Sequence, residues 1–223
     1  MPARALRRVT VALTVLALGA GLALVIGAAI GLRQDRSLPP DVGTVAGAAP
    51  SRPPAPAPSV SVPSVSVPSV SVPRPARSVP ATVSIPSLNV TAQVLPVVNT
   101  GGVLGVPDDP AQLGWWTGGA QPGAARGSVI IDGHVDSAST GPGALFRLGR
   151  LNPGDRIAVT SRTGASHSYT VTGRRSYPKA AGLPAELFDR AGPSRLVLIS
   201  CGGAFDRSAG SYLDNIVVFA APS

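Results

Sequence analysis

The chain has 223 residues and a formal net charge of +8, but this charge is unevenly distributed. Before Ser78, eight arginines face two aspartates, whereas from Ser78 onward ten arginines and one lysine face nine acids. A nucleic-acid-binding domain concentrates its basic side chains on the folded part, so this distribution argues against nucleic acid as a partner. The single cysteine excludes an intramolecular disulfide and is too few for a structural zinc site.

Residues 1–8 form a basic tail, and residues 9–32 follow as an uncharged, mostly apolar stretch. As a helix these residues would reach roughly 36 Å, enough to cross a hydrocarbon core of about 30 Å. We therefore expect a transmembrane anchor. The alternative is a cleaved signal peptide, whose apolar region is usually shorter, at about 7 to 15 residues. The arginines that precede the span predict a cytoplasmic N-terminus and an extracellular remainder.

Residues 33–77 are rich in Pro, Ser and Val, and SVSVP occurs three times between Ser59 and Pro73. Proline at every fifth position blocks a helix and removes the donors that a central strand needs. We expect a disordered stalk here. It is either a spacer that holds a domain off the membrane across a wall layer, or a tolerated low-complexity linker.

Residues 78–223 have the composition of a globular domain large enough to fold alone. Short apolar runs between turn signals such as NTGG, NPGD and RTGA predict strands. One short helix is expected at 183–190, where Pro184 lies near the first turn. Many short strands with little helix favour an all-β barrel or sandwich. The predicted strands are 81–85, 92–98, 128–132, 156–161, 168–172, 196–200 and 215–220.

The sequence RLVLISCGG, from Arg195 to Gly203, brings the only cysteine, Cys201, to the end of a buried strand. Gly202 and Gly203 are expected to form a turn that lets a substrate backbone approach the sulfur. A small buried residue without chemistry is the alternative for an arbitrary lone cysteine. The position at a strand end beside two glycines favours a nucleophile.

His134, in IIDGHVDS, also directly follows an apolar strand. The other histidine, His167, enters a strand after a hairpin turn and is expected to face solvent. A thiol is mostly protonated at neutral pH and needs a neighbouring imidazole to become a thiolate or to manage its proton. His134 is therefore the predicted general acid and base for Cys201.

These segments resemble the sortases, the cysteine transpeptidases of Gram-positive cell surfaces, and in particular the actinobacterial class F sortases. The similar segments are VSIPSLNVTAQVLPV, LGVPDDPAQLGWWTGGAQPGAARGSVIIDGHVDS, GALFRLGRLNPGD and LVLISCGGAFDRSAGSYLDNIVVFAA. The resemblance covers roughly residues 80 to 221. It implies a closed barrel of about eight strands, with His134 and Cys201 at the ends of neighbouring strands.

Two positions differ from the sortase pattern. Ser200 stands where sortases commonly have Thr before the nucleophile, and it keeps the hydroxyl. The last strand, LDNIVVFA, has no arginine, although the family places one there to hold the substrate or its oxyanion. Candidate donors are Arg207, Asn215, the backbone amides around Gly202 and Gly203, or an arginine elsewhere such as Arg147.

The resemblance implies cleavage of an LPXTG-like sorting signal on exported proteins through a Cys201 thioester. Transfer to an amine of a peptidoglycan precursor would complete the transpeptidation, with no cofactor and no metal. The alternatives are another wall-acting cysteine enzyme, such as an L,D-transpeptidase or peptidoglycan hydrolase, and a non-catalytic surface binding module. A thiol-reactive probe distinguishes the last, because a structural thiol would stay unlabelled.

Overall fold

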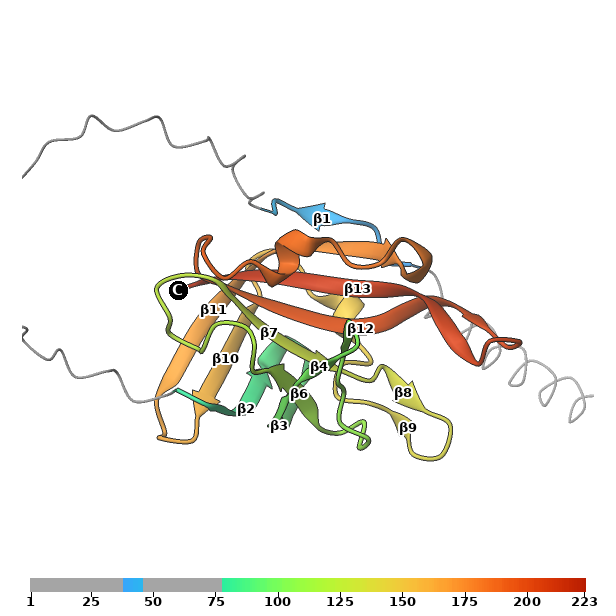
Figure 1. The fold of residues 1–223 in the computed structure, drawn as a ribbon, viewed down its shortest axis with the longest axis horizontal. Coiled ribbons are helices and arrows are strands. Elements are labelled where there is room, and N and C mark those ends of the chain that lie inside the picture. Colours follow the sequence, from blue (N-terminus) through green and yellow to red (C-terminus); the bar gives the residue numbers. More distant parts are fainter. Residues whose placement is uncertain (1–37, 46–77) are drawn as a thin grey trace, which may run out of the picture.

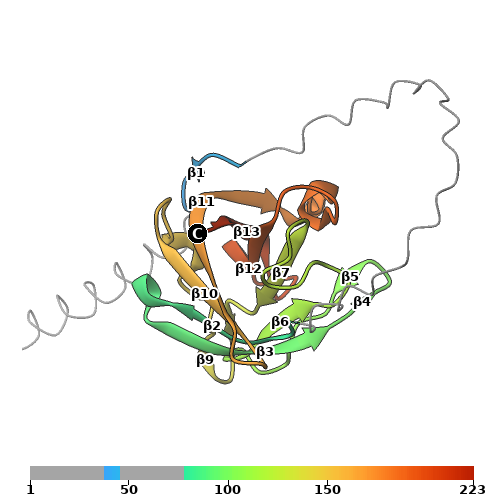
Figure 2. The same ribbon diagram turned by 90° about the vertical axis from the view of Figure 1, so that its left-hand side faces the viewer.

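The computed structural model describes residues 38–45 and 78–223, and eight strands of this part form a closed barrel (Figure 1). The order around the barrel is β11-β10-β2-β3-β6-β7-β12-β13, and β13 pairs with β11 to close it (Figure 2). The predicted all-β closed barrel is therefore confirmed. The strands are β2 (Pro80–Ile85), β3 (Val90–Val97), β6 (Leu113–Trp116), β7 (Ser128–Gly133), β10 (Arg156–Ser161), β11 (Ser166–Pro178), β12 (Arg195–Asp206) and β13 (Ser211–Pro222).

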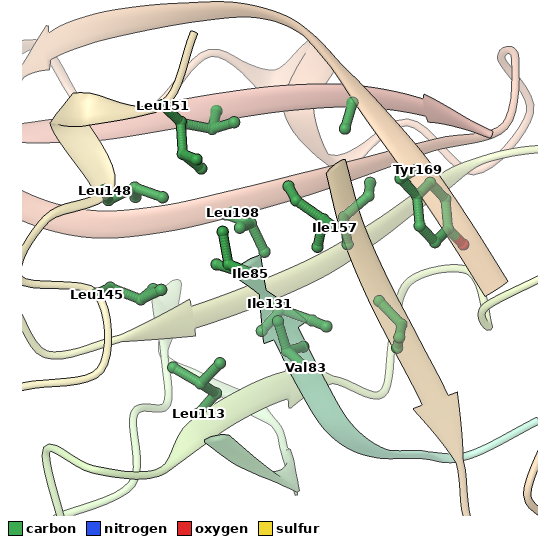
Figure 3. Close-up of a cluster of buried hydrophobic side chains, with 14 of the residues drawn as sticks. Val83, Ile85, Leu113, Ile131, Leu145, Leu148, Leu151, Ile157, Tyr169 and Leu198 are labelled. Atoms are coloured by element: carbon green, nitrogen blue, oxygen red, sulfur yellow. The ribbon is translucent and has the colours of Figure 1, made fainter. Parts of the chain in front are cut away.

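Alternation of side chains along the central strands creates two apolar clusters. On β12, Leu196 and Leu198 point into the barrel, where they pack with residues such as Ile85, Ile131 and Ile157 (Figure 3). The intervening Val197 and Ile199 point outward and join a second cluster on the outer face of β7, β12 and β13. Because both faces of β12 are covered, its sequence is a continuous apolar run rather than an alternating one.

The outer cluster is covered in part by η4 (Ala185–Phe188), a 3-10 helix that is shorter than the helix expected over 183–190. All seven predicted strands are present, and β6 was not predicted. The remaining short elements are η1 (Pro86–Leu88), η2 (Leu148–Arg150), η3 (Lys179–Ala181), the β4 (Asn99–Thr100) and β5 (Val103–Leu104) hairpin, and the β8 (Asp136–Ser137) and β9 (Gly141–Pro142) hairpin.

Strand β12 does not end at the Gly-Gly pair, so the expectation of a turn there was wrong. The strand continues to Asp206 and pairs with β13 in a long hairpin that extends from the barrel (Figure 1). The pairing register shifts between Gly202 and Phe205, which identifies a bulge inside the strand. The nucleophile candidate therefore lies within a strand, immediately before a bulge.

Residues 38–45 fall in the segment expected to be an unpacked stalk, and there the structure differs. Strand β1 (Val42–Gly43) pairs antiparallel with the edge of β11. The Arg175 guanidinium donates to the carbonyls of Val42 and Gly43 at 2.7 and 2.8 Å. The expectation missed this strand because it is formed by pairing with a distant partner, not by local sequence. Val45 and Ser78 both lie on the barrel, so residues 46–77 join two points of one domain.

Among the residues that the structure describes, no helix is long and apolar enough to cross a membrane. The predicted span over 9–32, the tail over 1–8 and the rest of the predicted stalk lie outside the described residues.

Candidate active site

Strand register brings His134, Cys201 and Asn215 into one row. Gly133, the last residue of β7, pairs in parallel with Ser200 of β12, and His134 and Cys201 are the residues that directly follow this last pair. Cys201 in turn pairs with Asn215 of β13. Side chains of such directly paired residues lie on the same face, with Cβ atoms about 4.5 to 5.5 Å apart in an antiparallel pair. All three residues are half-buried on the outer face of the barrel.

Ser200 does not belong to this row, because neighbouring residues of a strand point to opposite faces. Its side chain is buried, and its hydroxyl donates a 2.9 Å hydrogen bond to the carbonyl oxygen of Gly133. This bond ties β12 to β7 immediately beside His134 and Cys201. The structure thus places Ser200 where it aligns the two strands rather than where it faces a substrate.

The two glycines after Cys201 are required by packing. A Cβ at Gly202 would lie 2.5 Å from Cδ1 of Ile216. Gly203 has a φ of +77°, and a Cβ there would lie 2.2 Å from the Oδ2 atom of Asp214, a buried residue of β13. Any other residue at Gly203 would therefore face both backbone strain and a collision.

Arg207 lies in the exposed turn at the tip of the β12–β13 hairpin. The Asp206 carboxylate shapes this turn by accepting hydrogen bonds from the N–H and the hydroxyl of Ser208. These hydrogen bonds lower the pKa of Asp206. The extended strand between Cys201 and Arg207 separates their backbones by on the order of 20 Å. The structure therefore does not bring Arg207 to the Cys201 row, and Arg147 is also exposed, at the start of η2.

The loop that carries His134 is attached to the same hairpin. The Tyr212 hydroxyl on β13 donates a 2.5 Å hydrogen bond to Oδ2 of Asp136. Below the loop, Gly143 leaves room for the His134 carbonyl, since a Cβ at Gly143 would lie 2.5 Å from that oxygen. The hydrogen bond anchors the loop two residues after His134, and the missing side chain at Gly143 lets the loop backbone lie close to it. His167, by contrast, lies at the start of β11, half-buried rather than facing solvent, with its Nε2 3.1 Å from the Ser78 hydroxyl.

Two residues near this row were missed by sequence reasoning. Tyr177 of β11 pairs with Asn215 and so extends the row by one residue. Burial raises the pKa of its hydroxyl, which remains a hydrogen-bond donor at neutral pH. The second is Asp132, two residues before His134 on the same face of β7. A carboxylate inside an otherwise apolar strand, SVIIDG, was the signal that could have identified it.

Asp132 is 3% exposed, and neither carboxyl oxygen has a hydrogen-bond partner among the described residues. Burial raises its pKa from 3.8 to about 7. Around the row as a whole, the described residues hold no cluster of three His, Cys, Asp or Glu side chains that could bind a metal ion. The groups that the row does offer are a thiol, an imidazole, an amide and a phenol, which suit nucleophilic attack with proton transfer.

Comparison with known proteins identifies the family of this domain. The sortase domain family model matches residues 83–223, which include His134, Cys201 and Asn215. No curated protein matches the sequence.

Among solved structures, a lid mutant of sortase A from Corynebacterium diphtheriae matches with a TM-score of 0.50 and 21% identity, over 67% of this chain and 73% of that one. Sortase C1 from Streptococcus agalactiae matches with a TM-score of 0.50 and 19% identity, over 64% and 66%. These identities support the fold alone. The family model covers more than half of the chain, and the chain therefore belongs to the sortase family.

Proposed function

We propose that this protein is a cell-surface cysteine transpeptidase that cleaves a C-terminal sorting signal and joins the new carboxyl end to an amine of a cell-wall precursor. The observation that supports the proposal is the register that pairs Cys201 with Asn215 and ends at Gly133 and Ser200, directly before His134 and Cys201, with all three side chains half-buried. Membership of the sortase family supports the same chemistry. The LPXTG-like signal and the class F assignment come from the sequence resemblance.

Each side chain of the row has one role in this reaction. The Cys201 thiolate attacks the scissile carbonyl carbon, a C–S bond forms, and the carbonyl oxygen becomes an oxyanion. The His134 imidazolium gives its proton to the leaving nitrogen as the C–N bond breaks, which leaves a thioester. The incoming amine then loses a proton to His134 while it displaces the Cys201 sulfur.

Asn215 is the side-chain donor for the oxyanion in this proposal. It pairs directly with Cys201, whereas Arg207 lies at the far end of the hairpin. The amide Nδ2 can donate two hydrogen bonds, and the bulge at Gly202 and Gly203 leaves backbone N–H groups of this region outside the regular ladder. Donors fixed by strands before the reaction are worth the most, because they need not reorganise.

The proposed location is the cell membrane, with a single span over 9–32, a cytoplasmic N-terminus and an extracellular barrel. Because the segment Leu38–Val45 packs on the barrel, only residues 33–37 connect the proposed span to the packed chain. This short connection favours a barrel close to the membrane surface.

The test is incubation of the protein with a peptide that contains Leu-Pro-any-Thr-Gly, with and without an added amine. Mass spectrometry should detect a thioester on Cys201 and, with the amine, a transfer product. Cys201→Ala should abolish both, and His134→Ala should lower turnover by about 10²-fold or more. His167→Ala is the matched control and should leave turnover unchanged. A wild-type protein that forms no thioester with any such peptide would instead support a non-catalytic binding module.

A further inference from the structure

The segment Leu38–Val45 is fastened to the barrel at both of its ends. Near its start, the buried Arg174 guanidinium donates a 2.9 Å hydrogen bond to the carbonyl of Pro40. Near its end, the Thr44 N–H donates to the carbonyl of Thr172 at 3.0 Å. Together with the pairing of β1 and β11, these contacts fix where the chain enters the barrel and in which direction it runs.

The start of this segment lies at the level of the proposed nucleophile. A Cβ at Gly149 would lie 2.9 Å from Cγ of Pro39 and 3.4 Å from Cδ1 of Ile216. Ile216 pairs with Ser200, the residue directly before Cys201. From there β1 runs antiparallel to β11 and away from the β12–β13 hairpin (Figure 1). The preceding chain therefore joins the barrel at the end from which the hairpin projects.

Exposed apolar side chains gather at this same end. On the β12–β13 hairpin, beyond the level of Cys201, Phe205 is 46% and Leu213 is 50% exposed. Leu38 is exposed where the chain joins the barrel, and Phe146 is exposed in the loop that packs against the His134 carbonyl. Single exposed apolar side chains are common on protein surfaces, whereas several at one end of a domain indicate a contact site.

The hairpin extends about as far as the chain before Leu38 can reach. The proposed span ends at Leu32, and the five residues 33–37 cover at most about 17 Å, so the bilayer surface lies within that distance of Leu38. The hairpin extends on the order of 20 Å from Cys201 to its turn, in the direction from which the chain enters. Its tip therefore meets the lipid headgroups before the rest of the barrel does.

Apolar burial rather than net charge would stabilise this contact. The turn carries one exposed cation, Arg207, and one anion, Asp206, whose carboxylate is already hydrogen-bonded to Ser208. The Phe205 ring packs edge-on against Tyr212, with ring centroids 5.1 Å apart, and is thus held in place while it stays accessible. Apolar side chains of this kind enter the boundary between headgroups and acyl chains, and a long arginine keeps its charge in water.

On the basis of the membrane span in the proposed function, we infer that the tip of the β12–β13 hairpin is a membrane-contact site. Phe205 and Leu213 insert among the lipid headgroups, and Leu38 lies near the same surface. The contact fixes the orientation of the barrel, with the Cys201 end toward the bilayer. The proposed nucleophile then lies on the order of 20 Å from the lipid surface, within reach of a peptide segment that has just emerged from the membrane.

The single thiol allows a site-specific test, because Cys201→Ala leaves the chain without cysteine. In this background, Phe205→Cys and Arg207→Cys each carry a polarity-sensitive fluorophore, in the full chain inserted into vesicles that contain a lipid-bound quencher. Both labels should lose most of their emission to the quencher. Arg207 is exposed, so its replacement covers the case in which Phe205→Cys does not fold. The matched control is Ala165→Cys, in the exposed turn between β10 and β11 at the opposite end of the barrel, which should keep its emission.

The inference is overturned if the quencher reaches neither hairpin label, or if it reaches the label at position 165 equally well. Emission that responds to a Leu-Pro-any-Thr-Gly peptide but not to the lipid quencher would assign the hairpin to substrate binding instead. A chain that does not float with the vesicles would refute the proposed span and this inference with it. None of these readouts requires turnover, so a hairpin in contact with lipid, in a protein that forms no thioester, would refute only the proposed reaction.

Discussion

The buried Asp132 carboxyl should make the stability of the barrel depend on pH in an unusual direction. Its pKa is raised in the folded state, from 3.8 to about 7, because the side chain loses contact with water. The folded protein therefore binds the Asp132 proton more tightly than the unfolded chain does. Its stabilising contribution is complete below pH 3.8, decreases as the pH rises toward 7, and does not change further above that value.

The magnitude follows from the same two values. At 1.36 kcal/mol per pKa unit, a rise from 3.8 to about 7 corresponds to about 4 kcal/mol of folding stability lost across this range. Water screens this free-energy difference little, because the Asp132 side chain is only 3% exposed. This is a large fraction of the total stability of an ordinary domain, at about 5 to 15 kcal/mol.

The assay is urea unfolding followed by tryptophan fluorescence, since both tryptophans, Trp115 and Trp116, lie on β6 beside Asp132. The free energy of unfolding is measured between pH 4 and pH 8 for wild type and for Asp132→Asn, which removes the titrating group with little change in shape. Carboxylates with lowered pKa, such as Asp206, stabilise in the opposite direction, but they affect both proteins equally. The wild-type value should fall relative to the variant by up to about 4 kcal/mol. Parallel pH dependences would refute the reasoning.

Three further predictions follow from other contacts. In steady-state kinetics on one peptide, Asn215→Ala should lower kcat by about 10²- to 10³-fold, while Arg207→Ala should change kcat little. The reverse ranking would mean that the oxyanion donor is Arg207 in the hairpin turn. Gly203→Ala should lower the free energy of unfolding by about 1 to 3 kcal/mol in urea, because Gly203 has a φ of +77° and a Cβ there would collide with the Asp214 carboxylate. Gly164→Ala is the control, because Gly164 has a φ of +85° but open space around it, and it should destabilise the fold less. Equal destabilisation by the two variants would mean that the collision with Asp214 contributes nothing. Arg175→Ala should increase hydrogen exchange of the 42–45 amides with little change in barrel stability, and unchanged exchange would mean that other contacts hold β1.

Much of the barrel could be predicted because its strands are local features of the sequence. The run from Leu196 to Ile199 is apolar on both faces, and the alternation along 156–161 has one apolar face, so each reads as a strand without knowledge of its partners. Strand β6 escaped prediction because it is only four residues long, LGWW, and one of the four is a glycine, Gly114, which pairs with Asp132. Strand β1 escaped because only its pairing with β11 makes it a strand.

The sequence by itself determined which groups can act: one thiol, one histidine after a buried strand, and the glycines that follow Cys201. Only the tertiary structure decided which groups meet. The parallel register of β7 and β12 ends at the pair Gly133–Ser200, directly before His134 and Cys201, and the antiparallel register of β12 and β13 pairs Cys201 with Asn215, while Arg207 lies at the hairpin tip. The same registers bury Asp132 one row below the pair. Register depends on contacts between residues far apart in the chain, and a shift of one residue would turn each of these side chains to the opposite face.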